Sequence, residues 1–237
     1  MKKQLLGLSV LVTFLSASAL AAGPVANIQV TGDIKPPTCT VNGGNDDLLY
    51  ALGNYSPSLI SNTSVYQFPS VSNQLTVSCD AETYLTFKGE DAYPSVDTII
   101  SSTENINAKY ATFNLVNADN TEQQVGGIVF KWSNVMVDGQ PAFLSRANDG
   151  PNAGTWNQDT VLQKNVTIGW TSKQQKNVAV DELALVSGKV FTADIYNRND
   201  SNRSYILSNE TLATIGIDIS EGVDFIGQSI LTFSFGV

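Results

Sequence analysis

The two cysteines of the chain lie in Pro36-Pro37-Thr38-Cys39-Thr40-Val41 and Leu75-Thr76-Val77-Ser78-Cys79-Asp80. Around each cysteine, apolar or β-branched residues alternate with polar ones, a pattern typical of β-strands. The two cysteines are too far apart for a zinc knuckle, and the chain has no histidine to complete a metal site. We therefore expect Cys39 and Cys79 to join two neighbouring strands as a disulfide. Two reduced, buried cysteines are the alternative.

The N-terminus has the three parts of an export signal. A pair of lysines near the start supplies positive charge, an apolar stretch runs from Leu5 to Leu20, and Ala19-Leu20-Ala21 offers a small-residue cleavage site. The apolar stretch is short for a membrane span. We expect a signal peptide at residues 1–21 and one mature domain at residues 22–237, in an oxidising compartment where disulfides persist. A buried N-terminal helix is the alternative.

The 237-residue chain is acidic, with 22 Asp and Glu residues against 13 Lys and Arg residues and a net charge of -9. Such a charge argues against nucleic acid or an anionic membrane as the partner. After the signal, no stretch approaches the roughly 20 apolar residues that a transmembrane helix needs. We expect a soluble mature chain without membrane insertion, long enough to bury a core as one domain.

Alternation of period two recurs along the mature chain. The clearest strand-like segments are residues 26–31, 75–78, 84–87, 128–132, 166–170 and 189–193. Turn formers separate them, as in Gly43-Gly44-Asn45-Asp46 and Asn148-Asp149-Gly150-Pro151. The best helical candidate, Asp181 to Val186, covers little more than one turn. Strands separated by turns predict an all-β fold, either a sandwich or a barrel.

The residue inventory argues against catalysis and against a cofactor. Without histidine, neither a Ser-His-Asp nor a Cys-His arrangement can form, and no nucleophile elbow or phosphate-binding glycine loop occurs. Acidic pairs at Asp46-Asp47, Glu90-Asp91 and Asp181-Glu182 lie in turn-like segments, and we expect them to be solvated rather than to hydrolyse a glycoside. Oxygen atoms of Asn148, Asp149 and Asn152 could bind calcium, but the EF-hand spacing is missing. We expect a protein that is not an enzyme.

The three tryptophans fall into two groups. Trp132 and Trp170 lie in apolar, strand-like segments, and we expect them in the core. Trp156 follows a loop-like stretch with two glycines and precedes polar residues 157–159. An exposed ring at this position can stack on a sugar while the neighbouring amides bond its hydroxyls. Trp156 is therefore a candidate glycan contact.

The C-terminal residues form the second informative segment. Leu231, Phe233, Phe235 and Val237 alternate with polar residues or glycine. A strand with such a strongly apolar face must bury it. Two interpretations stay open: a terminal strand of the protein's own core, or a recognition strand beside which another chain adds a strand.

Residues 28–41 resemble the first strand of bacterial chaperone–usher fimbrial subunits, in which a glycine such as Gly32 interrupts an alternating strand and a cysteine follows. The partner cysteine of that family ends a second strand, as Cys79 does here. The terminal alternating strand is also similar. The strongest likeness is to enterobacterial fimbria-like periplasmic proteins whose role is poorly defined, and it is specific over residues 26–80 and 229–237.

The resemblance implies a one-domain, immunoglobulin-like (pilin-type) β-sandwich that lacks its last strand. The gap leaves an apolar groove, which a periplasmic chaperone fills first and a neighbouring fimbrial subunit, delivered at an outer-membrane usher, fills later. Leu231, Phe233 and Phe235 would lie beside the groove, and the carboxylate of Val237 would meet basic residues of the chaperone. The implied protein is a non-enzymatic structural subunit of a periplasmic or cell-surface fimbrium that contributes to cell adhesion.

Two features depart from the family pattern. A polymerising subunit donates an N-terminal strand, but only Ala22-Gly23-Pro24-Val25 separate the expected cleavage site from the alternating segment, a span of about 13 Å. Gly222 is also offset from the usual position before the last aromatic residue. The sequence therefore predicts a chain that receives a strand without donating one, as a cap or a tip does. A glycan-binding tip adhesin and a stand-alone periplasmic protein are the alternatives.

Overall fold

The computed structural model describes residues 28–101, 106–150 and 160–236. They form two units, an N-terminal segment that ends at Lys35 and a compact body that begins at Pro36. The expected signal peptide at residues 1–21 lies outside the described residues, as do Trp156 and Val237. No helix within the described ranges has the length and apolar character needed to cross a membrane.

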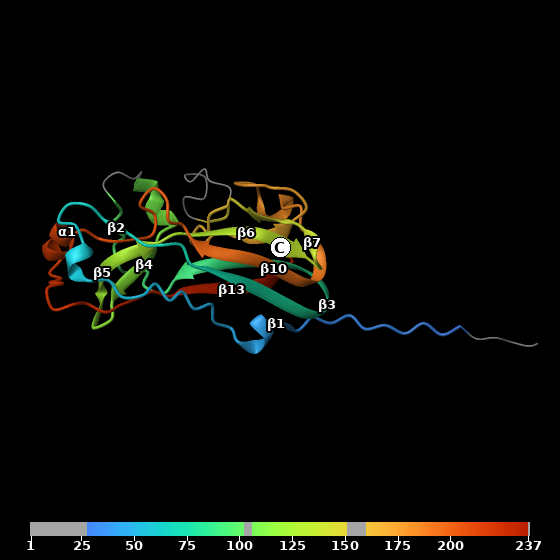
Figure 1. The fold of residues 1–237 in the computed structure, drawn as a ribbon. Coiled ribbons are helices and arrows are strands. Elements are labelled where there is room, and N and C mark those ends of the chain that lie inside the picture. Colours follow the sequence, from blue (N-terminus) through green and yellow to red (C-terminus); the bar gives the residue numbers. More distant parts are fainter. Residues whose placement is uncertain (1–27, 102–105, 151–159, 237) are drawn as a thin grey trace, which may run out of the picture. The chain divides into compact units, whose positions relative to one another are not determined.

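The body is built from two antiparallel sheets (Figure 1). The strands described for the larger sheet are β1 (Cys39–Val41), β3 (Ser72–Asp91), β6 (Phe130–Val137), β7 (Gln140–Pro141), β8 (Phe143–Arg146), β9 (Ile168–Thr171), β10 (Ser187–Asn197) and β13 (Ser229–Phe235). Those of the smaller sheet are β2 (Tyr66–Gln67), β4 (Phe113–Asn117), β5 (Asn120–Ile128), β11 (Tyr205–Ile206) and β12 (Phe225–Ile226). The prediction of a mainly β chain is confirmed.

β3 is the spine of the larger sheet, because it runs for 20 residues and pairs with β1, β9, β10 and β13. Its first half pairs with β10 and, with Cys79 opposite Cys39, with β1. Its second half pairs with β13, from Ser229 opposite Asp91 to Phe235 opposite Leu85. Cys39 and Cys79 form the predicted disulfide, which ties β1 to β3.

Apolar residues of both sheets contribute to one core. Trp170 of β9 packs between Phe87 of β3 and Phe191 of β10, and the ring centroids are 5.5 Å and 5.4 Å from that of Trp170. Trp132 and Trp170 are both buried, as the sequence predicted. Aromatic side chains of this size contribute much of the apolar surface that a β-rich core removes from water.

Helical structure is confined to short pieces. They are η1 (Asn42–Gly44), η2 (Pro57–Leu59), η3 (Ile106–Tyr110), η5 (Val180–Glu182) and α1 (Asn209–Thr214). The helical prediction from Asp181 to Val186 is wrong beyond one 3-10 turn, since η5 ends at Glu182 and leads into β10. α1 follows Ser208, whose hydroxyl accepts a hydrogen bond from the Thr211 N–H at 3.3 Å and caps the helix.

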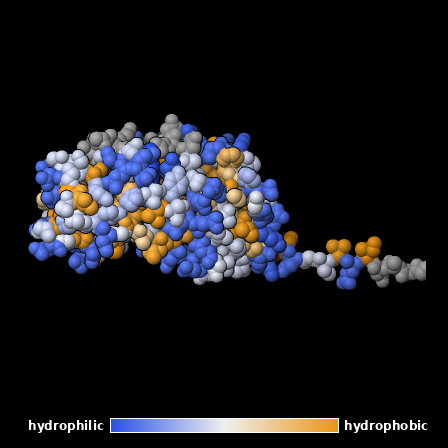
Figure 2. Space-filling view, viewed as in Figure 1, coloured by the Kyte–Doolittle hydropathy of each residue, from blue (hydrophilic) through white to orange (hydrophobic). Residues whose placement is uncertain are grey.

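The N-terminal segment corrects the prediction of a strand at residues 26–31. Among the described residues no strand precedes Cys39. Ile28, Val30 and Ile34 are 93%, 89% and 103% exposed, and Figure 2 shows hydrophobic residues uncovered along this segment. Alternation specifies which side chains share a face but not what covers that face. The alternation of apolar and polar residues therefore predicted a strand, whereas in the structure this segment is exposed and pairs with no strand.

Candidate functional site

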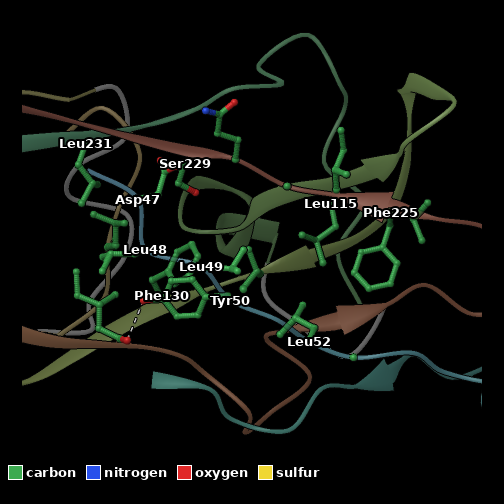
Figure 3. Close-up of a pocket in the computed structure, with 18 of the residues that line it drawn as sticks. Asp47, Leu48, Leu49, Tyr50, Leu52, Leu115, Phe130, Phe225, Ser229 and Leu231 are labelled. Carbon is green, nitrogen blue, oxygen red and sulfur yellow. Dashed lines mark hydrogen bonds between the residues drawn. The ribbon is translucent and has the colours of Figure 1, made fainter. Parts of the chain in front are cut away.

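An apolar groove of about 1510 Å³ opens on the body between two segments that are far apart in sequence (Figure 3). One wall is residues 45–55, which we call the strap, and the other is formed by β12 and β13. The floor consists of core residues from both sheets: Leu75, Leu115, Val125, Ile128, Phe130, Ile195 and Ile206. Because core side chains line an open groove, the two sheets do not close over each other here.

β13 presents alternate side chains to the groove. Leu231 and Phe233 line it and are half-buried, and the Phe233 ring lies 5.7 Å from the ring of Phe87. Ile230, which precedes Leu231 in β13, is 46% exposed and does not line the groove. Phe235 is 48% exposed and also lies outside its lining. The structure thus brings two of the predicted C-terminal side chains to the groove, while Val237 lies outside the described residues.

One edge of β13 has no partner strand. In the described part of the chain, β3 is the strand that pairs with β13, and no second strand pairs with it. The N–H and C=O groups of the other edge are therefore available to a further strand. A free edge next to an apolar groove is the geometry that strand addition uses.

Side chains, rather than a ladder of backbone bonds, hold the strap in place. Within the described residues, none of its backbone groups bonds to the backbone of a strand. The Tyr50 hydroxyl donates to the Ile195 carbonyl at 2.8 Å, and the Tyr50 ring lies 5.1 Å from that of Phe130. The Asn73 amide donates to the Leu49 carbonyl at 3.0 Å. Burial raises the pKa of Tyr50, so its hydroxyl keeps the proton that it donates.

The strap is the part of the site that sequence reasoning missed. Leu48, Tyr50 and Leu52 are half-buried and alternate with exposed residues. This period-two pattern was a detectable signal of a wall beside an apolar surface. The alternation is confined to residues 48–52, between turn formers at residues 43–46 and at Gly53-Asn54, and it belongs to no strand.

A second, polar pocket of about 520 Å³ lies beside the C-terminal end of β3. Lys164 Nζ lies 3.2 Å from Asp91 Oδ2, and the Asp91 carboxylate accepts backbone N–H bonds from Tyr93 and Asn114. Burial lowers the pKa of Lys164, against the opposing effect of Asp91. The prediction that Glu90-Asp91 is a solvated pair is wrong for Asp91, which is buried because it ends a strand instead of lying in a turn.

The oxygen atoms proposed for calcium are partly used by other contacts. Asp149 accepts hydrogen bonds from the Thr167 N–H at 2.9 Å and hydroxyl at 2.7 Å, and its carboxylate lies 2.9 Å from Lys88 Nζ. Across the described ranges no group of three His, Cys, Asp or Glu side chains is placed to hold a metal ion. Asn152 and Trp156 lie outside the described residues, so the glycan contact at Trp156 stays a prediction.

No protein-family model matches the chain, and no curated protein gives a significant match. The groove, with its free strand edge, is therefore the basis for a functional proposal.

Proposed function

We propose that the chain is a non-enzymatic, fimbria-like structural subunit that is exported to the periplasm and contributes to cell adhesion. A strand supplied by another chain fills its groove. The donor is first a periplasmic chaperone and then, with the help of an outer-membrane usher, a neighbouring subunit. On this proposal the body is an immunoglobulin-like, pilin-type sandwich that lacks its last strand.

The free edge of β13 beside the apolar floor is the observation that carries the proposal. An unpaired edge exposes backbone donors and acceptors, and the half-buried Leu231 and Phe233 leave part of their apolar surface to water in the groove. An added strand would satisfy the unpaired backbone groups of β13, and its alternate side chains would enter the groove and cover the apolar surface there. Each isoleucine- or leucine-sized side chain buried in this way contributes about 1.5–3 kcal/mol.

The N-terminal segment supports donation of a strand as well as reception. The sequence-based expectation counted only residues 22–25 as available to donate. Ile28, Val30 and Ile34 are exposed, however, and no strand is described before Cys39. When extended, residues 28–34 span about 23 Å, a full strand length. We therefore replace the expectation of a purely receiving chain with the proposal that one copy can donate this segment to another.

A labelled peptide of residues 26–35 tests the groove directly. We expect the peptide to bind the mature chain and to raise its unfolding temperature, since a ligand that binds only the folded state stabilises it. Leu231→Asp places a carboxylate in the apolar groove and should weaken binding at least about tenfold, because burial of an unpaired charge is costly. Fluorescence anisotropy measures both affinities.

Ile230→Asp is the matched control for Leu231→Asp. Ile230 neighbours Leu231 in β13 but does not line the groove, so peptide affinity should stay at the wild-type value. Absence of peptide binding by the wild-type chain would contradict the proposal. An equal loss of affinity in both variants would also contradict it, because the binding surface would then not be the groove.

A further inference from the structure

Among the described residues, three carboxylates and no basic side chain line the groove. Asp46 and Asp47 belong to the strap, and Asp224 precedes β12. All three residues are exposed, and none has an ion-pair partner in the part of the chain that the structure describes. Their charges are therefore free to act on a strand that enters the groove.

Asp47 and Phe225, the residue that follows Asp224 in the chain, lie on opposite sides of the groove. Figure 3 shows Asp47 and Leu231 on one side of the view and Leu52 and Phe225, which follows Asp224, on the other. The chain from Phe225 to Leu231 comprises β12, a short connection and the start of β13. In extended form this stretch covers about 20 Å, which is the length of an ordinary strand of about six residues.

We infer that the groove is fitted to a strand of a partner protein in which an alternating apolar core is flanked by lysine or arginine at both ends. The inference rests on the proposed function and names the chemistry of the strand that enters. The apolar core of that strand occupies the floor. Its flanking cations lie at the rim, near Asp46 and Asp47 at one end and Asp224 at the other.

Charges at a rim act mainly on the rate of association. Complementary charge steers a partner into place and like charge repels it, over a screening length of about 10 Å at 0.1 M salt. The net charge of -9 on the whole chain adds to the repulsion of acidic partners. A strand with basic flanks is therefore captured faster than a strand with the same apolar core and acidic flanks.

The N-terminal segment of a second copy has the apolar residues that the floor of the groove requires, but it lacks the positive charge that would complement the carboxylates at the rim. Lys35 follows Ile34, but Asp33 precedes Ile34 and its carboxylate lies 3.8 Å from Lys35 Nζ. On the other side of Ile28 stand Ala26-Asn27, which carry no charge. This segment brings little net charge to the rim. A basic partner strand is consequently captured before a second copy of the chain.

Three synthetic peptides separate the effect of charge from the apolar fit. All contain residues 28–34 with Asp33→Asn, and they carry lysines, glutamines or glutamates at both ends. Stopped-flow fluorescence with the mature chain measures association rates at low and at high salt. At low salt we expect the lysine peptide to associate about tenfold faster than the glutamate peptide, and at high salt we expect the rates to converge.

Variants of the rim assign the rate difference to the three carboxylates. The combination of Asp46→Asn, Asp47→Asn and Asp224→Asn should remove most of the difference between the lysine and glutamate peptides. Asp181→Asn is the control, because Asp181 is exposed and does not line the groove. It should leave the difference unchanged.

The outcomes separate this inference from the proposed function. Equal rates for the three peptides would overturn the charge selection and leave the groove as a strand site. The inference would also be contradicted if the triple variant kept the full rate difference between the lysine and glutamate peptides. The net charge of the chain, and not the three carboxylates, would then explain that difference. Binding of none of the peptides would remove the strand site and the inference with it.

Discussion

At the scale of single residues, two ion pairs of this chain differ sharply in exposure. The side chains of Lys164 and Asp91 are 16% and 3% exposed, whereas those of Lys35 and Asp33 are 67% and 75% exposed. Water screens the exposed pair, so its net contribution to stability is small. Removal of one partner from the buried pair leaves a charge that water cannot reach. The two pairs therefore make a matched test of burial.

Lys164→Met should lower the free energy of unfolding by about 3 kcal/mol, because the carboxylate of Asp91 is left without its counter-ion. Urea unfolding followed by tryptophan fluorescence measures the loss. Lys35→Met, which breaks the exposed pair, should change the same quantity by less than about 0.5 kcal/mol. Equal effects of the two substitutions would show that the pair at the end of β3 is as solvated as the pair at the N-terminal segment.

Asp149 predicts a specific response to acid. Partial burial alone would raise the pKa of Asp149, but hydrogen bonds from Thr167 and the contact with Lys88 outweigh it and lower the pKa below 3.8. A lowered pKa in the folded state stabilises the protein above pH 3.8, and this contribution disappears as the pH falls through the lowered value. The stability difference between wild type and Asp149→Asn should thus be constant near neutral pH and shrink in acid.

Unfolding by urea across a pH series measures that difference. Asp181→Asn serves as the comparison, because Asp181 is exposed and forms no ion pair within the described residues. A difference between wild type and Asp149→Asn that grows as the solution becomes more acidic would contradict the assignment.

At the scale of elements, the alternation of apolar and polar residues predicted several strands correctly, but it did not predict which segments pack against them. The patterns around Leu75, Trp132 and Trp170 correspond to buried parts of β3, β6 and β9. The cysteine pair was correctly joined, because the expected export signal and the lack of histidine left few other uses for two thiols. The exposure of Ile28, Val30 and Ile34 and the position of the strap were not predicted. Both depend on which segments become neighbours in space, and local alternation indicates which side chains share a face but not which surface covers that face.

Tyr50→Phe tests whether the strap depends on a single polar anchor. The substitution removes the hydrogen bond to the Ile195 carbonyl but keeps the ring that packs against Phe130. We expect a loss of about 1 kcal/mol in the free energy of unfolding and faster amide exchange within residues 45–55, because few other hydrogen bonds join this segment to the body. Hydrogen-exchange mass spectrometry provides the local measurement.

Tyr84→Phe is the control for this prediction, since Tyr84 lies in β3 and its side chain is 49% exposed. It should leave exchange in residues 45–55 unchanged. Unaltered exchange of the strap in Tyr50→Phe would mean that its apolar side chains are sufficient to hold it.

At the scale of the whole molecule, the chain carries two unlike apolar surfaces: a groove on the body and an exposed segment ahead of it. On the proposed function, the segment of one copy enters the groove of the next. Such a contact joins two different patches, so it does not close on itself as a symmetric dimer does. Repetition of the contact gives a linear assembly with a free groove at one end.

Ile28→Asp combined with Val30→Asp should abolish this self-association, because charged side chains cannot fill an apolar groove. Analytical ultracentrifugation of the mature protein should show concentration-dependent growth for wild type and a monomer for the double variant. Gln29→Asp adds charge to the opposite face of the same segment and should still permit growth. Monomeric behaviour of wild type at all concentrations would argue against donation between copies.

The Cys39–Cys79 bridge also determines how the body responds to tension. While the covalent bond holds, the chain between the two cysteines cannot be drawn out, so pulling at the ends lengthens the molecule only by residues outside that loop. The antiparallel ladder between β13 and β3 spans 7 residues, and tension from the chain ends reaches it through Cys79 and Phe235, which lie at the same end of the ladder, so its rungs are loaded one after another. A filament built from such units would resist stretching first through these rungs, and each unit that gave way would release less length than its residue count suggests.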